Sequence, residues 1–292
     1  MTDMDIYGHA GVREQLDRIA ASAVTPQSFL FTGPRQLGKF LVASEFAEKL
    51  SGGGATTETA LGDVLVIGRD GATPETDMAK SAALSVADIR RADAFLSCFP
   101  GSGKYRVVII DEADRLTLSA ENALLKILEE PNSTSIIILV THLPGQLLPT
   151  VRSRLFTVAF TPLTSSELRT HFPKVDVPDF FFSLGLPGLI AEAAQDPIVF
   201  AAKKDRLRGL FQLTRLTWAD RLSLAEKLAV EPDDLPDLLE MWLIGLERQR
   251  GEQSMQSVAF VTFLDAVLET LDQVSRKEGN PRLILEKLFT QA

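Results

Sequence analysis

Residues 29–40 read Phe-Leu-Phe-Thr-Gly-Pro-Arg-Gln-Leu-Gly-Lys-Phe. The first four residues predict a short buried strand, and the apolar spacing that starts at Lys39 predicts a helix. Between them, Gly33, Gly38 and Lys39 satisfy the pattern G-x-x-x-x-G-K. In this strand-loop-helix setting, loop amides and the helix N-terminus can bind phosphate groups, and the lysine can reach the outer phosphates of a nucleotide.

Phe40 follows the lysine, at the position where a serine or threonine would bind magnesium. A phenyl ring cannot ligate a metal ion, so the loop keeps the outline of a phosphate site and loses a direct metal ligand. We therefore expect ATP or ADP to bind weakly, without hydrolysis and without firmly held magnesium. The alternative interpretation is an ordinary glycine turn in which Lys39 is solvated.

A second stretch, residues 107–114, reads Val-Val-Ile-Ile-Asp-Glu-Ala-Asp. Its continuous β-branched residues predict a central parallel strand that is covered on both faces. In nucleotide hydrolases with such a strand, Asp111 would orient magnesium through water and Glu112 would polarise the attacking water. With Phe40 in the loop, we expect Glu112 to be vestigial or weakly active. We interpret Asp114 as a cap for the next helix.

Strands and helices alternate along the chain up to about residue 161. Apolar runs at 64–67 and 136–140 predict two more strands, and Ser85 and Ser119 are predicted to cap helices. This alternation implies right-handed crossovers and a parallel sheet, hence an α/β fold. Beyond residue 162 the spacing is helical, and helices are predicted over 180–194, 207–216, 218–229, 235–246, 258–274 and 281–289.

Charge and cysteine content exclude several classes of function. The chain has 30 Lys and Arg against 39 Asp and Glu, a net charge of −9, so only a local basic patch could hold nucleic acid. The single cysteine, Cys98, excludes a cysteine-rich zinc site, and we interpret it as a small buried residue. Because the N-terminus lacks signal-peptide features and no apolar run is long enough to span a membrane, we expect a cytoplasmic protein with no membrane partner.

Polar residues after the fourth predicted strand are further candidates. Thr141 ends that strand, where its side chain would lie beside the phosphate site. We interpret His142 as a surface or hydrogen-bonded histidine, because the sequence places no carboxylate or cysteine partner beside it. Arg152 and Arg154 follow in a loop, where a guanidinium group could reach a phosphate held by an adjacent subunit. Taken alone, these arginines would be a solvated basic turn.

Residues 101–154 closely resemble the sliding-clamp loader subunits of bacterial DNA polymerase III, which belong to the AAA+ group. The most specific parts are Asn-Ala-Leu-Leu-Lys at 122–126, Leu-Glu-Glu-Pro at 128–131 and Ser-Arg at 153–154. The resemblance extends over about residues 6–195, and beyond that only length and helical character agree.

The resemblance implies a fold of three parts. These are a P-loop AAA+ core with a parallel sheet at 1–161, a small helical lid at 162–202 and an all-helical collar for oligomerisation at 203–292. It also implies a hetero-oligomer in which other clamp-loader subunits are the partners, and in which the assembled complex contacts the sliding clamp and primed DNA.

Departures from the family pattern favour one type of subunit. The family contains motor subunits that hydrolyse ATP and a delta prime subunit that usually does not. Here Gln36 and Phe40 replace a glycine and the metal ligand, residues 51–80 hold no cysteine where the family has a zinc module, and residues 185–189 (Gly-Leu-Pro-Gly-Leu) lack the lid arginine of motor subunits. Arg154 is retained, although Leu155 stands where the family usually has cysteine. This pattern is most like delta prime, with Arg154 completing a neighbour's ATP site in trans.

Three hypotheses follow from the sequence. The first is a non-hydrolysing, delta prime-like clamp-loader subunit with no zinc and no metal site of its own, acting as an accessory subunit of the polymerase. The second is an active ATP-hydrolysing motor, because Lys39, Asp111 and Glu112 persist. The third is a non-enzymatic replication adaptor that docks partners through its C-terminal helices.

Overall fold

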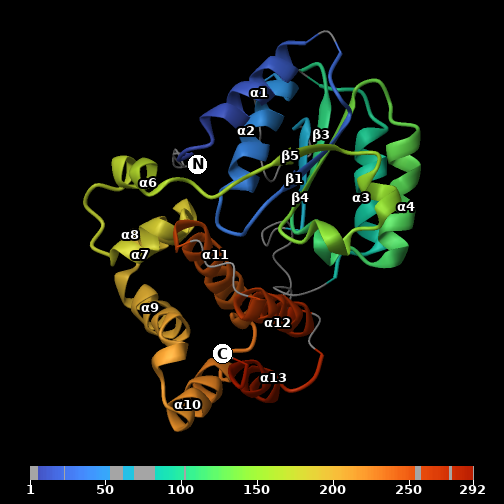
Figure 1. Cartoon of the computed structure of the whole chain (residues 1–292). Helices are drawn as coiled ribbons and strands as arrows, with labels where there is room; N and C mark the ends of the chain where they lie inside the picture. Colours follow the sequence, from blue (N-terminus) through green and yellow to red (C-terminus); the bar gives the residue numbers. More distant parts are fainter. Residues whose placement is uncertain are drawn as a thin grey trace. The chain divides into compact units, whose positions relative to one another are not determined.

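The computed structural model describes residues 6–22, 24–52, 62–68, 83–101, 103–253, 258–275 and 278–291. The chain divides into two compact units, Met1–Thr161 and Pro162–Ala292 (Figure 1). Most of the Gly- and Thr-rich segment 51–62, predicted to be a loop, and most of the cysteine-free segment 51–80 lie outside the described residues.

A five-stranded parallel sheet forms the centre of the first unit, which confirms the predicted α/β class. The strand order is β2-β3-β4-β1-β5, and every neighbouring pair is parallel. The first strand is therefore internal, and Leu30 lies opposite Leu139 on one side and Thr157 on the other. The strands are β1 (Ser28–Thr32), β2 (Val64–Ile67), β3 (Arg106–Ile110), β4 (Ser135–Thr141) and β5 (Phe156–Ala159).

Helices cover both faces of the sheet because the strand side chains alternate between them (Figure 1). On one face, Phe29 and Phe31 pack around Phe46 of α2. On the other, Leu30 and Val108 belong to an apolar cluster with residues of α3 and α4. The helices of this unit are α1 (Ala10–Ala21), α2 (Lys39–Ser51), α3 (Val86–Leu96), α4 (Leu118–Glu129) and the short α5 (Pro149–Arg152).

The caps of α3 and α4 differ in how well the sequence predicts them. The capping box of α3 is confirmed, since Ser85 N donates to Asp88 Oδ2 at 2.8 Å. Ser119 does not cap α4, because the helix begins one residue earlier and Thr117 Oγ1 accepts from Ala120 N at 3.2 Å. Thr117 and Ser119 both carry a hydroxyl that could cap a helix, and Thr117 is the residue that makes the hydrogen bond.

The second unit is helical throughout its described residues. The predicted helix over 180–194 is interrupted, because Gly185 adopts φ 75° at the end of α7 and Pro187 starts α8. The division into a lid and a collar at 202/203 stays a prediction, and α9 runs through that point. The helices are α6 (Ser165–His171), α7 (Asp179–Leu184), α8 (Pro187–Gln195), α9 (Pro197–Phe211), α10 (Trp218–Ala229), α11 (Leu235–Gln253), α12 (Val258–Ser275) and α13 (Pro281–Phe289).

Two further observations concern the sequence predictions. In the described part of the chain, no helix combines the length and the hydropathy needed to cross a bilayer. Cys98 is exposed at the end of α3, so its interpretation as a buried residue is wrong. The reason is local: α3 ends at Leu96, so Cys98 lies beyond the buried face of the helix.

Candidate functional site

The phosphate loop joins β1 to α2 at the carboxyl edge of the sheet. Gly38 adopts φ 79° directly before Lys39, the first residue of α2, so the loop ends at a helix N-terminus. Gly33 adopts φ 141°, and a Cβ there would lie 2.3 Å from the carbonyl oxygen of Phe160. Only glycine fits at that position. Gln36 also has a positive φ, 60°, which is uncommon for a residue with a side chain.

Lys39 is oriented by its own loop. Its Nζ donates to the carbonyl oxygens of Gly33 and Pro34, both at 2.6 Å, and the residue is 7% exposed. The ammonium group therefore lies across the loop, where a bound phosphate would be a stronger partner than two neutral carbonyls. The loop, the helix N-terminus and the lysine fit a phosphate group; the half-buried Phe40 offers magnesium no ligand.

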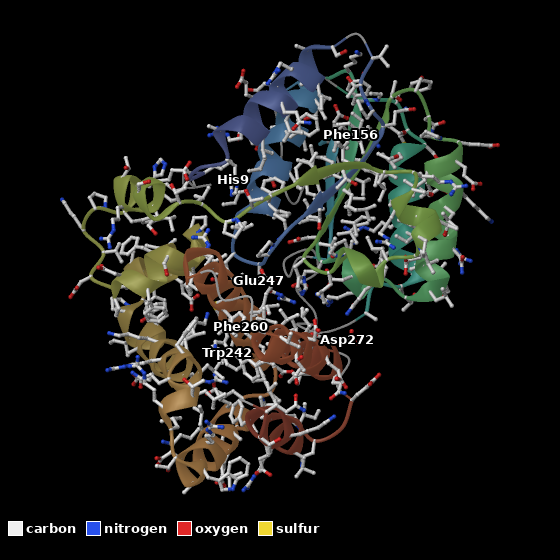
Figure 2. All side chains as sticks on the ribbon, in the orientation of Figure 1. His9, Phe156, Trp242, Glu247, Phe260 and Asp272 are labelled. Carbon is white, nitrogen blue, oxygen red and sulfur yellow. The ribbon has the colours of Figure 1, made fainter. Side chains whose placement is uncertain are left out.

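His9 is a contact of the loop that sequence reasoning missed. It lies directly before α1 (Figure 2) and has φ 56°. Its Nε2 lies 2.9 Å from the carbonyl oxygen of Leu37. Its ring also packs edge-on against Phe160, with centroids 5.1 Å apart. The chain separation of 28 residues leaves no local signal for this contact. His9 thus supports the loop from outside the motif.

Of the two acids after β3, Glu112 lies near the phosphate loop. Asp111 Oδ1 accepts from Glu112 N at 3.0 Å, which fixes the turn at the strand end. Glu112 adopts φ 50°, and its carboxylate contacts Arg115 and lies 3.7 Å from Arg35 NH1. The structure thereby brings together the two motifs that the sequence singled out. It also gives Glu112 two guanidinium neighbours that compete with a water molecule for its oxygens.

Asp114, Thr141 and His142 form a buried polar cluster at the adjoining ends of β3 and β4. Thr141 Oγ1 donates to Asp114 Oδ1 at 2.6 Å and accepts from Leu143 N at 3.0 Å. His142 Nδ1 lies 3.2 Å from Asp114 Oδ1, and only 9% of the His142 side chain and 6% of the Asp114 side chain are exposed. His142 therefore fits the hydrogen-bonded alternative, with a carboxylate partner that the sequence did not reveal. The interpretation of Asp114 as a cap for the next helix is wrong, because Thr117 caps α4.

The same cluster sets the ionisation of Asp114. Burial opposes its charge, but hydrogen bonds from His142 and Thr141 and the positive field of His142 outweigh that cost and lower its pKa to about 2. A permanent carboxylate thus holds the Thr141 hydroxyl in place at the end of β4. Because β3 and β4 are parallel neighbours, their carboxyl ends lie side by side. A sequence analysis that paired these two strands could have predicted the contact between Asp114 and Thr141.

Arg154 lies after α5, and its interactions are with α4 and α5. Its guanidinium NH2 donates to Glu129 Oε1 at 2.8 Å, and NH1 donates to the carbonyl oxygen of Thr150 at 2.8 Å. The side chain is still 37% exposed. Sequence reasoning placed Arg154 on an edge of the molecule but did not identify Glu129, which belongs to the Leu-Glu-Glu-Pro stretch.

No group of three or more His, Cys, Asp or Glu side chains in the described residues is arranged to hold a metal ion. The candidate site therefore consists of the phosphate loop with Gly33, Gly38 and Lys39, the acids Asp111 and Glu112, and Thr141 at the end of β4. Arg154 is a separate exposed cation.

Comparisons with known proteins agree with this arrangement. The family model described as DNA polymerase III, delta subunit matches residues 8–164, more than half of the chain. A DNA polymerase III subunit gamma/tau of Mycobacterium tuberculosis is 32% identical over 237 residues, covering 75% of this chain and 39% of that protein. The delta' subunit of Pseudomonas aeruginosa is 30% identical over 144 residues, covering 47% of this chain and 44% of that protein.

A second delta' relative and one solved structure are also similar to this chain. The delta' subunit of Bacillus subtilis is 30% identical over 155 residues, 51% of this chain and 46% of that protein. A crystal structure of a DNA polymerase III gamma subunit-related protein from Thermotoga maritima overlaps 95% of this chain and 97% of that one, at 21% identity and a TM-score of 0.46, and the assignment does not depend on it. The chain spans about two fifths of the length of the gamma/tau relatives. Because the family model matches residues 8–164, the chain belongs to the DNA polymerase III delta subunit family. This agrees with the resemblance of its sequence to the AAA+ clamp-loader subunits.

Proposed function

We propose that this chain is a non-hydrolysing, delta prime-like subunit of the DNA polymerase III clamp loader, which helps to load the sliding clamp onto primed DNA. In this role it supplies Arg154 to the ATP site of a neighbouring motor subunit. The observation that carries the proposal is the geometry of Arg154, whose guanidinium is oriented by Glu129 and Thr150 while the side chain stays 37% exposed.

Such an arginine needs position and charge rather than a nucleotide site of its own. A guanidinium held in one orientation can place two N–H donors on phosphate oxygens and offset the negative charge that develops during phosphoryl transfer. The exposed pair with Glu129 costs little to break, because ion pairs in solvent contribute about 0–1 kcal/mol. A phosphate on a neighbouring subunit would therefore compete well for Arg154.

The phosphate loop supports the non-hydrolysing part of the proposal. Phe40 takes the place of a magnesium ligand, Lys39 is hydrogen-bonded to the loop itself, and Glu112 lies between Arg35 and Arg115. A bound nucleotide would supply phosphates for the loop amides and Lys39. We expect ATP or ADP to bind weakly and with little dependence on magnesium.

An ATP-hydrolysing motor is the second candidate. It is favoured by the persistence of Lys39, Asp111 and Glu112, and by the gamma/tau relatives, which match more of this chain than the delta' relatives do. A strong magnesium-dependent turnover would support it.

Steady-state ATP hydrolysis by the purified chain separates the two candidates. The measurement compares wild type with Glu112→Gln and Lys39→Ala, which also control for contaminating ATPases. Equal and negligible rates for all three support the non-hydrolysing subunit. Turnover by wild type that both variants lose would show a motor and refute this part of the proposal.

The trans role is tested in the complex reconstituted with the other clamp-loader subunits of the same organism. We expect Arg154→Ala to lower its ATPase rate at least about tenfold, given the usual contribution of an arginine finger. Arg152→Ala is the matched control, because Arg152 is an exposed arginine two residues away. Normal assembly with an unchanged rate for Arg154→Ala would rule out the trans role.

A further inference from the structure

A cavity of about 510 Å³ lies within the second unit, remote in sequence from the phosphate loop. It is lined by residues of α7, α9 and α11, three helices that contact one another through the α7–α11 and α9–α11 pairs (Figure 1). Its volume falls within the range of about 300–1,000 Å³ that is usual for sites of small organic ligands. The residues used below are Phe180, Lys204, Arg208, Phe211, Gly245 and Arg248.

The wall of this cavity is positively charged although the protein carries a net charge of −9. Among the residues that the structure describes, three cations and no acidic side chain line it. Lys204 and Arg208 lie one turn apart on α9, where two like charges at this spacing repel each other. An anion placed between them would turn that repulsion into attraction.

Other cations of α9 behave differently. Lys203 Nζ lies 2.7 Å from Glu192 Oε1, and Arg206 pairs with Glu231 and Asp234. Lys204 and Arg208 make no ion pair with any residue that the structure describes. The α9 cations outside the cavity, Lys203 and Arg206, are therefore paired with carboxylates, whereas Lys204 and Arg208, which line it, are not paired with any described carboxylate.

Arg248 is fixed at the other side of the cavity. Its NH1 donates to the carbonyl oxygen of Ser183, and its NH2 donates to that of Leu163 at 3.0 Å. Both acceptors are backbone carbonyl groups, and they orient the guanidinium. A Cβ at Gly185 would lie 2.5 Å from Arg248 NH2, and glycine there gives the guanidinium room.

Two aromatic rings complete the lining. Phe180 and Phe211 pack edge to face with centroids 5.2 Å apart. Phe211 lies over the bare backbone of Gly245, where a Cβ would come within 2.3 Å of its ring. Aromatic rings of this kind offer a surface on which a planar base can pack, while the cations suit a doubly charged phosphate.

We propose that this cavity binds a nucleoside phosphate, with the phosphate between Lys204, Arg208 and Arg248 and the base against Phe180 and Phe211. The ligand is a free nucleotide or the phosphorylated end of a single strand, which share this chemistry. The site is independent of the proposed clamp-loader function, because every residue that lines it belongs to the second unit.

Calorimetric titration of the full chain tests the proposal. All proteins carry Lys39→Ala, so that binding at the phosphate loop does not contribute, and the probes are AMP, adenosine and inorganic phosphate. We expect AMP to bind more tightly than adenosine or phosphate alone. The double variant Lys204→Glu/Arg208→Glu should weaken AMP binding at least about tenfold, because it replaces two attractions with two repulsions.

The control is Lys227→Glu/Lys287→Glu, which changes the net charge equally at exposed positions of α10 and α13. We expect it to change AMP affinity less than about twofold, since distant surface charges are screened by salt. The single variant Arg208→Ala, at an exposed position, gives a test that a folding defect of the double variant cannot obscure; it should weaken binding several-fold.

Three results would overturn the proposal: no binding of AMP, equal loss in the control and the cavity variant, or binding of AMP that neither cavity variant weakens. An acidic peptide that binds where AMP does not would overturn it as well. Competition between AMP and a 5′-phosphorylated oligothymidylate then distinguishes the two possible ligands, a free nucleotide and the phosphorylated end of a single strand. Preference for the oligonucleotide identifies a strand end, and equal or weaker binding identifies a free nucleotide.

Discussion

Replacing Asp114 with asparagine removes the charge between Thr141 and His142 and keeps the size of the side chain. The pKa of Asp114 falls from the usual 3.8 to about 2 in the folded protein. At about 1.36 kcal/mol per pKa unit, this corresponds to roughly 2 kcal/mol of folding stability at pH 7, or a factor of more than ten. Asparagine can still accept the hydrogen bond from Thr141, so most of the loss should come from the charge.

The sign of the pH dependence follows from the lowered pKa. Because the folded protein binds this proton less tightly than the unfolded chain, the stabilisation is complete above the unfolded pKa of 3.8 and disappears as the pH falls through about 2. The stabilising effect at pH 7 should therefore be several-fold smaller at pH 3. This decline distinguishes a charge effect from a packing effect.

Hydrogen exchange of the β3 and β4 amides is the appropriate assay, because it reports on the first unit alone and does not require two-state unfolding of the chain. Wild type and Asp114→Asn are compared at the same pH, so intrinsic exchange rates cancel. Asp93→Asn, on the exposed face of α3, is the control and should change protection less than about twofold at both pH values. A ratio that is the same at pH 7 and pH 3 would refute the reasoning.

Three other substitutions have defined outcomes. Thr117→Ala should lower the melting temperature of the first unit by removing the cap of α4, a loss of about 1 kcal/mol, and Ser119→Ala should cost less. Gly33→Ala should destabilise by more than about 2 kcal/mol in a urea titration, because its Cβ would meet the Phe160 carbonyl, whereas Gly11→Ala meets nothing within 4 Å. Glu129→Ala should leave unfolding within about 0.5 kcal/mol of wild type and lower the ATPase of the reconstituted complex several-fold; unchanged ATPase would mean that Glu129 does not orient Arg154.

Local patterns were sufficient for most of the sheet. The strand at 64–67 and the end of β3 at Ile110 were predicted correctly, because runs of β-branched residues bounded by turn residues have few alternatives. β5 was missed, since only Val158 of its four residues is buried and the strand pairs with β1 alone. An edge strand of this kind has no strong apolar alternation to read.

The sequence located the candidate residues at the ends of their strands and helices but did not predict their contacts. The phosphate loop and the acids after β3 could be placed because each motif carries its own strand and helix signals. The partners of the motif residues could not, since His9 contacts Leu37, Asp114 contacts His142 and Glu129 contacts Arg154 over 28, 28 and 25 residues of chain. Such contacts depend on how the sheet is folded, and a single sequence holds no periodicity that encodes them.

The contact between Gly33 and Phe160 has a mechanical consequence. Phe160 N donates to the carbonyl oxygen of Thr32 at 2.8 Å, and its own carbonyl closes over Gly33, just before the chain leaves the first unit at Thr161. A shift of the loop backbone at Gly33 toward Phe160 would therefore be blocked by the Phe160 carbonyl, one residue before the end of the first unit. The start of the phosphate loop and the end of the first unit are held together by direct backbone contact, although 127 residues of chain separate Gly33 from Phe160.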